Sequence, residues 1–415
     1  MSTASCTSTI PQKLSPRKQL SLLKHHFTKG SFENLVGIVR SSLKNHKGGN
    51  LSVMANDIGK CISTVSYFFN DAVWDISTVR KAIRRRLLSS PITKIDGSEI
   101  AAFDESSISK KGTKFEFIGD TWDNADKVVH DGYSLLAVAI VNAKKGTRFV
   151  FDEILCSNKD PQWRGTYPYI ERLLRRLFAT TKIALVVFDI GFRNQYLVQY
   201  VLNKGKNFIL RITLDMVLWS EDMKTKCKIR DIGKMQGVIS YDFSLEGKAG
   251  WNVMLYTGKV NAWMKKVTVP LTVVVIFRPS FRKPMVLCTS LPVHTLEDAL
   301  CVYEKYLNRW KIEMLFQDIK ELGLESFRVR RKKAIIKYIT IVILVHTLLT
   351  LVTHWARTFF TFSTAIQRLL RAKRKITSLV FRGMKIFYEI LFSRKMTLTR
   401  LFATTLIKKD ACVTG

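Results

Sequence analysis

The sequence is short of acidic residues. Its 415 residues include 33 Asp and Glu against 67 Lys and Arg, so the formal net charge at pH 7 is +34. Such an excess favours a polyanionic partner. Nucleic acid is the first candidate, because Lys and Arg contacts to phosphates supply much of its binding energy, and an anionic membrane surface is the second. Residues 1–98 hold 15 basic and 5 acidic side chains, and residues 321–415 hold 19 and 4. The acids therefore gather in the middle, between two basic arms.

Metal-binding and redox motifs of cysteine and histidine are also missing. The seven cysteines stand at positions 6, 61, 156, 227, 288, 301 and 412. No two of them form a C-x-x-C pair, which argues against a zinc ribbon or a thioredoxin-type motif. The seven histidines show no H-E-x-x-H spacing, so a zinc site is not expected. An odd number of scattered cysteines fits free thiols in a reducing compartment, and we expect a cytoplasmic protein.

Long hydrophobic runs and a secretory signal are lacking as well. The segment YITIVILVHTLLTLVT, residues 338–353, has only 16 residues and carries His346 in its middle. A helix that spans a bilayer needs about 20 apolar residues. The N-terminus has no basic segment followed by an apolar one, as a signal peptide would. We therefore expect a buried core helix at 338–353 and no membrane partner.

The chain from about residue 31 to residue 90 reads as helical. The chain is 47% hydrophobic and 11% aromatic, which indicates a folded protein. The stretch SFENLVGIVRSSL has apolar residues at helical spacing after a candidate cap, Ser31. Residues 51–74 then predict two short helices around Gly59, compatible with a helix-turn-helix whose second helix, about 62–69, enters a DNA groove. An ordinary small helical domain has the same pattern. A basic helix, STVRKAIRRRLLSS, follows and ends at Pro91.

The pattern changes to strands at residue 98. Apolar runs separated by turn residues predict the order β-β-β-α-β-α-β, which describes an α/β fold with a mixed sheet and helices on its faces. The acids between residues 120 and 131 are expected in a polar, solvated loop. Residues 213–294 contain further strand-like runs and predict a β-rich insertion. Helices resume at residue 294 and are expected to continue to about residue 390.

One predicted helix, YLNRWKIEMLFQDIK at 306–320, carries an unusual polar stripe. Tyr306, Arg309, Glu313 and Lys320 are separated by three, four and seven residues, which places them within an arc of roughly 60°. Apolar residues flank the stripe on both sides, and we expect both flanks to be buried: Trp310 and Met314 on one, Ile312, Phe316 and Ile319 on the other. A carboxylate among cations and apolar walls favours a functional site, although a solvated ladder of ion pairs has the same spacing.

Two aspartates follow apolar strands: Asp104 in AAFDESS and Asp189 in VVFDIGFRN. Ligand sites of α/β sheets gather at the carboxyl ends of strands, although an aspartate at that place often only caps a turn. Together with Glu313 on a facing helix, they form a set that suits two Mg²⁺ ions. Mg²⁺ prefers carboxylate oxygens, and an ion pair of this kind activates a nucleophile and stabilises the leaving oxygen in phosphoryl transfer. We expect the three carboxylates to converge.

The spacing Tyr-x₂-Arg-x₃-Glu-x₆-Lys that begins at Tyr306 resembles the Tyr-Arg-Glu-Lys signature of a group of bacterial insertion-sequence transposases, the IS-four group. Their catalytic core is an RNase H-like fold with an Asp-Asp-Glu triad. DIGFRN around Asp189 is similar to the group's second-aspartate region, and DESSISKKG after Phe103 to the first. The position of the β-rich insertion matches too. The resemblance covers roughly residues 98–330.

The resemblance implies roles for individual residues. The catalytic metal ligands would be Asp104, Asp189 and Glu313, holding two Mg²⁺ ions, with Mn²⁺ as the alternative. The contacts to phosphates of the transposon end would be Tyr306, Arg309 and Lys320. Arg193, at the start of a helix, is a further candidate for a phosphate contact. The partners implied are double-stranded DNA, as transposon ends and as target, and a second copy of the chain, in a homodimer on paired ends.

The resulting organisation has five parts. These are a helical DNA-binding region (1–97), the first part of an RNase H-like core (98–212), the β-rich insertion (213–294), a catalytic helix that completes the core (295–330) and a basic helical C-terminal region (331–415). The predicted function is a DNA transposase that cleaves insertion-sequence ends and joins them to target DNA. The alternatives are an RNase H-like nuclease, a non-catalytic DNA-binding relative and a membrane-surface protein.

Overall fold

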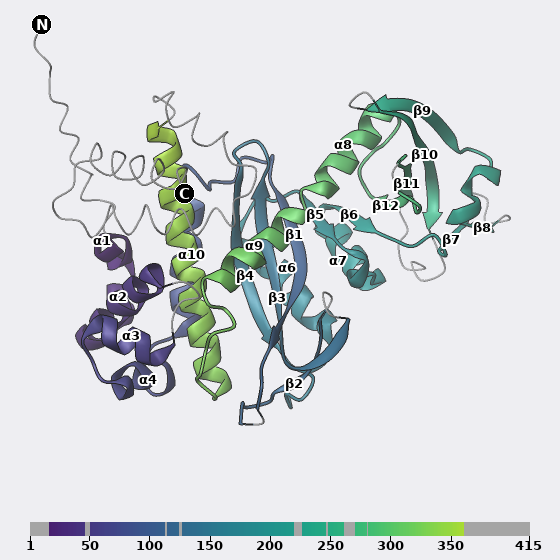
Figure 1. The fold of residues 1–415 in the computed structure, drawn as a ribbon. Helices are drawn as coiled ribbons and strands as arrows, with labels where there is room; N and C mark the ends of the chain where they lie inside the picture. The colour runs from purple at the N-terminus through teal and green to yellow at the C-terminus, as the bar shows by residue number, and fades with distance from the viewer. Residues whose placement is uncertain are drawn as a thin grey trace, which may run out of the picture. The chain divides into compact units, whose positions relative to one another are not determined.

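The computed structural model divides the chain into two compact units (Figure 1). It describes residues 16–45, 50–112, 114–123, 127–219, 226–245, 248–260, 270–279 and 281–360. The first unit combines the described parts of Met1–Lys94, Ser109–Ile118 and Phe316–Gly415, and the second combines those of Ile95–Ile108 and Gly119–Leu315.

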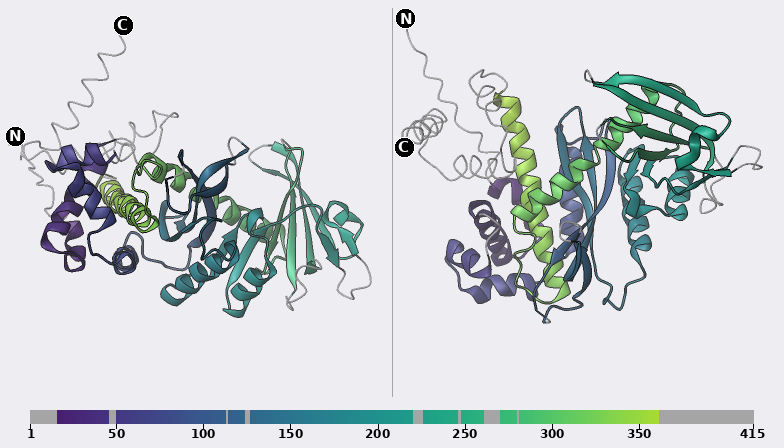
Figure 2. Two further views of the ribbon diagram at one scale, coloured as in Figure 1. Left: turned by 90° about the horizontal axis from the view of Figure 1, so that it is seen from below. Right: turned by 45° about the vertical axis from the view of Figure 1, so that its right-hand side comes forward.

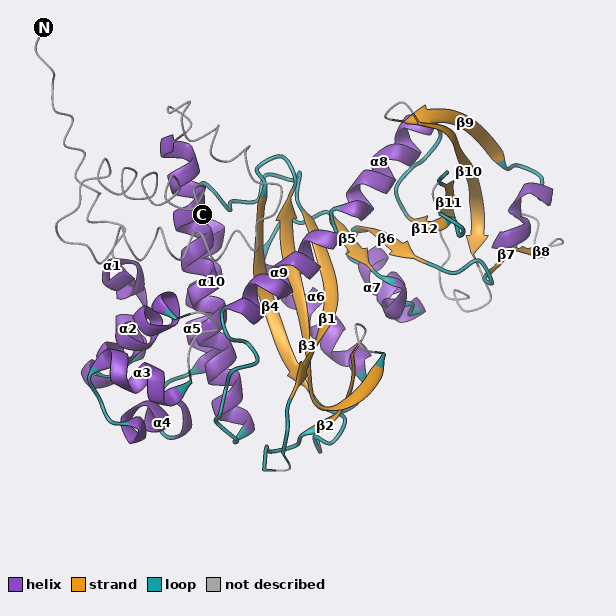
Figure 3. Cartoon of the chain, in the orientation of Figure 1, coloured by secondary structure: helices purple, strands orange, loops and turns teal. Residues whose placement is uncertain are grey.

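The first unit is built from helices, drawn in purple in Figure 3. They are α1 (Pro16–Leu20), the 3-10 helix η2 (Ser21–His26), α2 (Lys29–Lys44), α3 (Leu51–Ile58), α4 (Ile62–Asn70), α5 (Ile76–Ser89) and α10 (Lys332–Phe360). α2 begins after Thr28, whose side chain accepts a hydrogen bond from the backbone N–H of Ser31. The prediction that Ser31 caps this helix was wrong, because Thr28 already supplies the extended cap residue and its hydroxyl.

The two helices predicted around Gly59 are present as α3 and α4. Gly59 ends α3 with φ 64°, a left-handed conformation that glycine adopts at little cost. Only Lys60 and Cys61 then separate it from the start of α4. α2, α3 and α4 pack on one another. The chain therefore has two short helices joined by a tight turn at the predicted place, and the helix-turn-helix role in DNA binding stays a prediction.

The apolar segment that invited a membrane test lies inside α10. Residues Lys332–Leu351 are long and apolar enough to cross a membrane, but 89% of their most apolar window is buried inside the structure. α10 packs against α2, α4 and α5 of its own unit. This burial confirms the expectation of a buried core helix. The remainder of the basic C-terminal region, residues 361–415, lies outside the described residues.

The second unit contains one large mixed sheet with strand order β2-β3-β1-β5-β6-β12-β11-β10-β7-β8, in which β4 pairs with β3 and β9 with β10. The core strands are β1 (Ile100–Ser109), β2 (Gly119–Asp123), β3 (Val128–Asn142), β4 (Thr147–Cys156), β5 (Leu185–Phe188) and β6 (Asn207–Arg211). β1, β5 and β6 are parallel, whereas β2, β3 and β4 are antiparallel. α6 (Thr166–Thr180) packs on β3 and β4, and α7 (Gln195–Asn203) on β6. The predicted mixed α/β fold with flanking helices, consistent with an RNase H-like core, is confirmed.

The strands predicted between residues 213 and 294 are present and extend the same sheet (Figure 2). They are β7 (Val217–Trp219), β8 (Lys226–Lys228), β9 (Ile239–Leu245), β10 (Lys248–Val260), β11 (Leu271–Phe277) and β12 (Met285–Thr289). β12 pairs antiparallel with β6, for example Cys288 with Leu210. One hydrophobic cluster runs from Val187 in the core through Leu287 to Tyr303 and Tyr306 of α8 (Leu296–Leu307). This continuity fixes α8 beside the core strands.

One loop expectation was wrong. The acids near residue 120 were expected in a solvated loop, but Gly119–Asp123 form β2, and Asp120 lies opposite Asp131 of β3. The buried Thr121 of β2 is polar, whereas the apolar Trp122, Val128 and Val129 are exposed, so the hydrophobic alternation that marks a half-buried strand is missing there. Asp126, between the two strands, is outside the described residues.

Candidate active site

Two aspartates leave neighbouring parallel strands at the same level. In the register of β1 and β5, Phe103 pairs with Phe188, and the next residues along the two strands are Asp104 and Asp189. The prediction that Asp104 ends its strand was wrong, because β1 continues to Ser109. Its parallel pairing with β5 nevertheless ends just before Asp104. The two carboxylates are therefore side by side for the reason that parallel strands share an edge.

The third carboxylate, Glu313, lies on a helix that begins partway along the helix predicted at 306–320. The stripe was expected on one continuous helix, but α8 ends at Leu307 and α9 (Trp310–Glu321) begins three residues later. The side-chain amide and the backbone N–H of Asn308 both bond to the carbonyl of Glu304. Arg309 lies at the break, and Glu313 lies in the first turn of α9.

Only one flank of the stripe is buried as expected. Ile312 and Phe316 are buried, but Trp310 is 62% exposed and Met314 is 43% exposed. The expectation that both flanks are covered was therefore wrong. The angular positions were calculated for one ideal helix that starts at Tyr306. Because the helix is interrupted at Asn308, these positions do not apply to the residues of α9.

Arg309 joins all three acids. Its Nη1 lies 3.2 Å from Oδ2 of Asp104, its Nη2 lies 2.7 Å from Oε1 of Glu313, and its Nε lies 4.0 Å from Oδ1 of Asp189. The Arg309 side chain is only 8% exposed. The carboxylates of Asp104, Asp189 and Glu313, called the carboxylate triad below, therefore converge on one guanidinium, whereas the prediction was convergence within reach of shared metal ions.

Tyr306 and Arg211 complete the contacts of Asp189. The Tyr306 hydroxyl donates a hydrogen bond of 2.8 Å to Oδ1 of Asp189, and Nη1 of Arg211 on β6 lies 4.0 Å from the same atom. Tyr306 is buried, with 3% of its surface exposed. Sequence reasoning missed Arg211, although its place at the end of the KNFILRI strand, beside the strand of Asp189, was the signal that could have found it.

The electrostatics follow from burial and crowding of like charge. Burial raises the pKa of Asp104 to about 6; the Arg309 guanidinium opposes this rise, and the charges of Asp189 and Glu313 add to it. Burial, together with the charge of Asp189, raises the pKa of Tyr306 to about 12, so its hydroxyl stays protonated. Burial works against the charge of Arg309, but the surrounding groups, Asp189 foremost, hold the pKa of Arg309 above its ordinary value.

The triad has the donor chemistry of a Mg²⁺ site, with oxygen ligands from carboxylates and no sulfur or imidazole. Among the residues that the structure describes, no three acidic, His or Cys side chains lie in an arrangement that could already share a metal ion. Arg309 lies between them instead, and its Nε is buried without a hydrogen-bond partner. The residues fit the metal in kind, provided that the guanidinium moves. Bound there, two such ions would supply Lewis-acid activation of a phosphoryl group.

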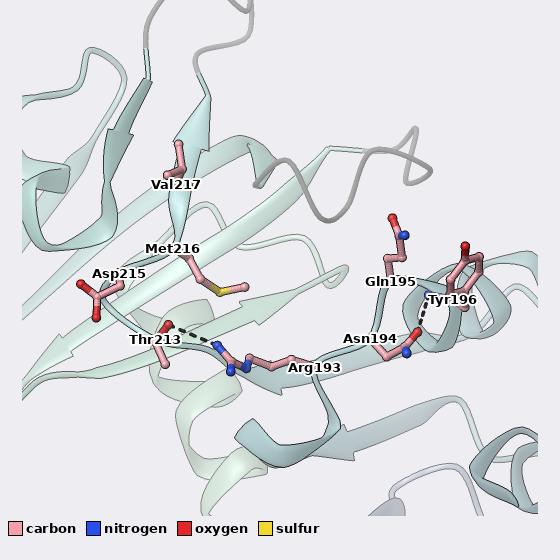
Figure 4. Close-up of a pocket in the computed structure, with 8 residues that line it drawn as sticks. All are labelled: Arg193, Asn194, Gln195, Tyr196, Thr213, Asp215, Met216 and Val217. Carbon is pink, nitrogen blue, oxygen red and sulfur yellow. Dashed lines mark hydrogen bonds between the residues drawn. The ribbon is translucent and has the colours of Figure 1, made fainter. Parts of the chain in front are cut away.

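Arg193 and Lys320, the other two predicted phosphate contacts, have partners of their own. Arg193 follows the turn after Asp189, and its Nη1 lies 3.4 Å from Oγ1 of Thr213. It lines a hollow of about 480 Å³ at the start of α7 (Figure 4). Lys320, near the end of α9, forms an ion pair of 2.8 Å with Glu325.

A comparison with known protein families identifies the family of the chain. Residues 91–348 match the family model of the transposase DDE domain. The chain belongs to this family. The matched range contains the whole carboxylate triad and starts after α5 of this DDE transposase. No curated protein matches the chain significantly. A DDE transposase acts on DNA, and the family generally uses divalent metal ions, in keeping with the donor set of the triad.

The five described cysteines of this transposase are Cys61, Cys156, Cys227, Cys288 and Cys301, and all are free thiols. The expectation of free thiols is confirmed for these residues. Cys6 and Cys412 lie outside the described part of the chain.

Proposed function

We propose that this DDE transposase cleaves the ends of an insertion sequence and joins them to target DNA by Mg²⁺-dependent phosphoryl transfer. The observation that carries the proposal is the convergence of Asp104 and Asp189, from adjacent parallel strands, with Glu313 from α9. Such transfer needs little covalent chemistry from the protein, because positioning and charge stabilisation supply the catalysis. The reaction takes place in the cytoplasm, where the protein associates with the nucleoid.

In this proposal the triad holds the metal ions and the other residues of the stripe hold DNA. Arg309 offers a planar fork that binds a phosphate with two hydrogen bonds, whereas Lys320 acts as a point charge. Arg193 contacts a further phosphate from the start of α7. Tyr306 orients Asp189 through its hydroxyl and contacts a phosphate of the transposon end. Membership of the IS-four group is supported by the four residues of its Tyr-Arg-Glu-Lys signature: Tyr306, Arg309, Glu313 and Lys320.

The N-terminal helices supply a second DNA contact in the proposal. α4 presents exposed side chains at the start of the helix and one turn further on, among them Ile62 (52% exposed), Ser63 and Tyr67 (56% exposed). The acidic side chains before and after α4 both form ion pairs, Asp57 with Lys44 and Asp71 with Arg331. Apolar and hydroxyl groups of this kind contact base edges in a major groove. We place α4 in that groove, with the basic arms of the chain on the phosphates.

The proposal is tested on a short duplex that the full-length protein selects from a random-sequence library. Asp104→Asn, Asp189→Asn and Glu313→Gln each remove a ligand charge and keep the side-chain shape. Each variant should lose Mg²⁺-dependent joining of the duplex to a target plasmid while it keeps its far-UV circular dichroism and its affinity for the duplex. Joining at near the wild-type rate by any folded variant would remove that residue from the triad.

The same assay separates the alternatives. An RNase H-like nuclease would cut the duplex with the same dependence on the triad but would leave no joined product. A non-catalytic relative would bind the duplex and release neither product. The proposal further holds that two copies of the chain act on two paired ends. Sedimentation of the protein with the duplex should therefore give a complex of two chains and two duplexes.

A further inference from the structure

Arg309 occupies the position in the triad where positive charge is needed. Its two terminal nitrogens bind one oxygen of Asp104 and one of Glu313, and its Nε faces Asp189. The only other described cation near these acids is Arg211, which reaches Asp189 alone and whose side chain is 43% exposed. Among the described residues, Arg309 is therefore the cation that contacts all three carboxylates.

We propose that Arg309 is an internal counter-ion that keeps metal ions off the triad until a DNA phosphate draws its guanidinium away. The inference rests on the proposed function and concerns the regulation of the same site. Arg309 then has two alternative partners, the triad and a phosphate, which it cannot bind at the same time. Bound to the triad, Arg309 uses the oxygens that a metal ion requires; bound to a phosphate, it leaves them free.

Competition between the two cations follows from the chemistry of the side chain. A guanidinium cannot lose its proton within the range in which proteins are folded, so Arg309 cannot neutralise itself when a divalent ion approaches. It has to leave the carboxylates, because two cations in one buried space repel each other strongly. Metal binding to the protein alone is therefore opposed by the three contacts of Arg309.

A phosphate can draw Arg309 away because the present contacts leave the arginine incompletely bonded. The Nε of Arg309 is buried and has no hydrogen-bond partner, and Oδ1 of Asp189 lies 4.0 Å from it. A phosphate accepts two parallel hydrogen bonds from such a fork, and charge-assisted bonds of this kind are among the strongest. When the phosphate replaces the triad as the partner of Arg309, the guanidinium is not left buried without a negative charge beside it.

The consequence is positive coupling between DNA and metal. A ligand that favours the state with Arg309 withdrawn must raise the affinity of the other ligand by the same factor. The triad then acquires its metal ions when a DNA end is in place, and the free transposase does not cut DNA that is merely nearby.

The test measures Mn²⁺ binding directly, through the electron paramagnetic resonance signal of free Mn²⁺, and needs no turnover. Wild-type protein should bind Mn²⁺ weakly alone, and the library-selected duplex should tighten that binding by about 5- to 150-fold, the usual range of such coupling. Arg309→Ala should bind Mn²⁺ more tightly than wild type without DNA. Adding the duplex should tighten its binding little further. Where Arg309→Ala does not fold, Arg309→Gln, which is also neutral, gives the same comparison.

A matched control is Arg175→Ala. Arg175 also forms an ion pair, of 2.8 Å, with a glutamate four residues away, but on the exposed surface of α6. This variant should keep wild-type Mn²⁺ binding with and without the duplex. The inference is overturned if a folded neutral variant of Arg309 binds Mn²⁺ no more tightly than wild type without DNA, or if the duplex tightens it by the wild-type factor. Joining by Glu313→Gln tests the proposed function separately, so the coupling can fail while the function stands.

Discussion

Tyr306 donates its hydroxyl hydrogen to Oδ1 of Asp189 over 2.8 Å, although 117 residues separate the two along the chain. Asp189 leaves the end of β5, and Tyr306 lies in the last turn of α8, inside the hydrophobic cluster that joins the core strands to the insertion. The hydrogen bond therefore ties a carboxylate of the triad to the hydrophobic cluster of the second unit.

Tyr306→Phe removes the hydroxyl, and with it the hydrogen bond to Asp189 and the proposed contact with a phosphate. Partners that orient a metal ligand typically contribute 10- to 100-fold to metal affinity or activity, so we expect a loss of about 10- to 100-fold in Mg²⁺-dependent joining. Because the pKa of Tyr306 is raised to about 12, the hydroxyl is a donor at every practical assay pH. The loss should therefore be the same at pH 7 and pH 9.

Tyr303→Phe is the control for this prediction. Tyr303 lies one turn earlier on α8, is 6% exposed and belongs to the same hydrophobic cluster, with its ring against Trp251. Its replacement should leave joining within about twofold of wild type. Equal losses in the two variants would mean that the packing of α8, and not the bond to Asp189, sets the rate.

Asp104 should destabilise the fold when it is charged. Its pKa rises from the ordinary 3.8 to about 6, first because it is buried, so the folded state binds its proton more tightly than the unfolded chain does. By linkage, this contribution to stability is complete below about pH 4 and is lost as the pH rises through 6. Asp104→Asn should therefore raise the free energy of unfolding by about 1–3 kcal/mol at pH 7.5 and by little at pH 4.

Urea unfolding of wild type and Asp104→Asn at the two pH values checks this prediction. A gain of equal size at both values would assign it to packing. A loss at pH 7.5 would mean that the contact with Arg309 outweighs the cost of burying the charge, contrary to the raised pKa.

Lys320→Ala separates DNA contact from structure. The ion pair of Lys320 with Glu325 is partly exposed, 33% and 41% for the two side chains, and such pairs contribute at most about 1 kcal/mol. Removing the lysine should change the free energy of unfolding by less than about 1 kcal/mol. If Lys320 holds a phosphate, binding of the duplex should weaken and its salt dependence should fall by about one phosphate contact.

Glu325→Ala is the matched control, because it releases Lys320 from its acidic partner. This variant should bind the duplex as tightly as wild type or more tightly. An unchanged affinity and salt dependence in Lys320→Ala would show that the lysine only pairs within the protein.

The sequence predicted most elements because their signals are local. The apolar run before Asp189 predicts a buried central strand, and Gly59 predicts a break between two helices; both are present. β2 was missed because a polar edge strand lacks the alternation of a half-buried one. The break at Asn308 was missed because neither Gly nor Pro stands there. The backbone N–H groups of Arg309, Lys311 and Ile312 bond to carbonyls three residues back instead of four, and this tightening leaves no strong local signal in the sequence.

The composition of the site was predictable, but its arrangement was not. Spacing and strand ends singled out Asp104, Asp189 and Glu313, and the structure brings them together. Spacing could not reveal that Arg309 would lie between them, because its position depends on the break before α9 and on the register of β1 with β5. Arg211 belongs to the network for the same reason, through the pairing of β5 with β6.

The central claim is that the three carboxylates form one metal site, and iron-directed cleavage of the protein backbone tests it most directly. Fe²⁺ replaces the bound ion in the complex with the selected duplex, and ascorbate with peroxide then generates radicals that cut the chain next to the metal. We predict fragments that end near residues 104, 189 and 313 in one population, suppressed by excess Mg²⁺ and absent in Glu313→Gln. Cleavage elsewhere, or cuts near 104 and 189 that persist unchanged in Glu313→Gln, would contradict a single site built from all three.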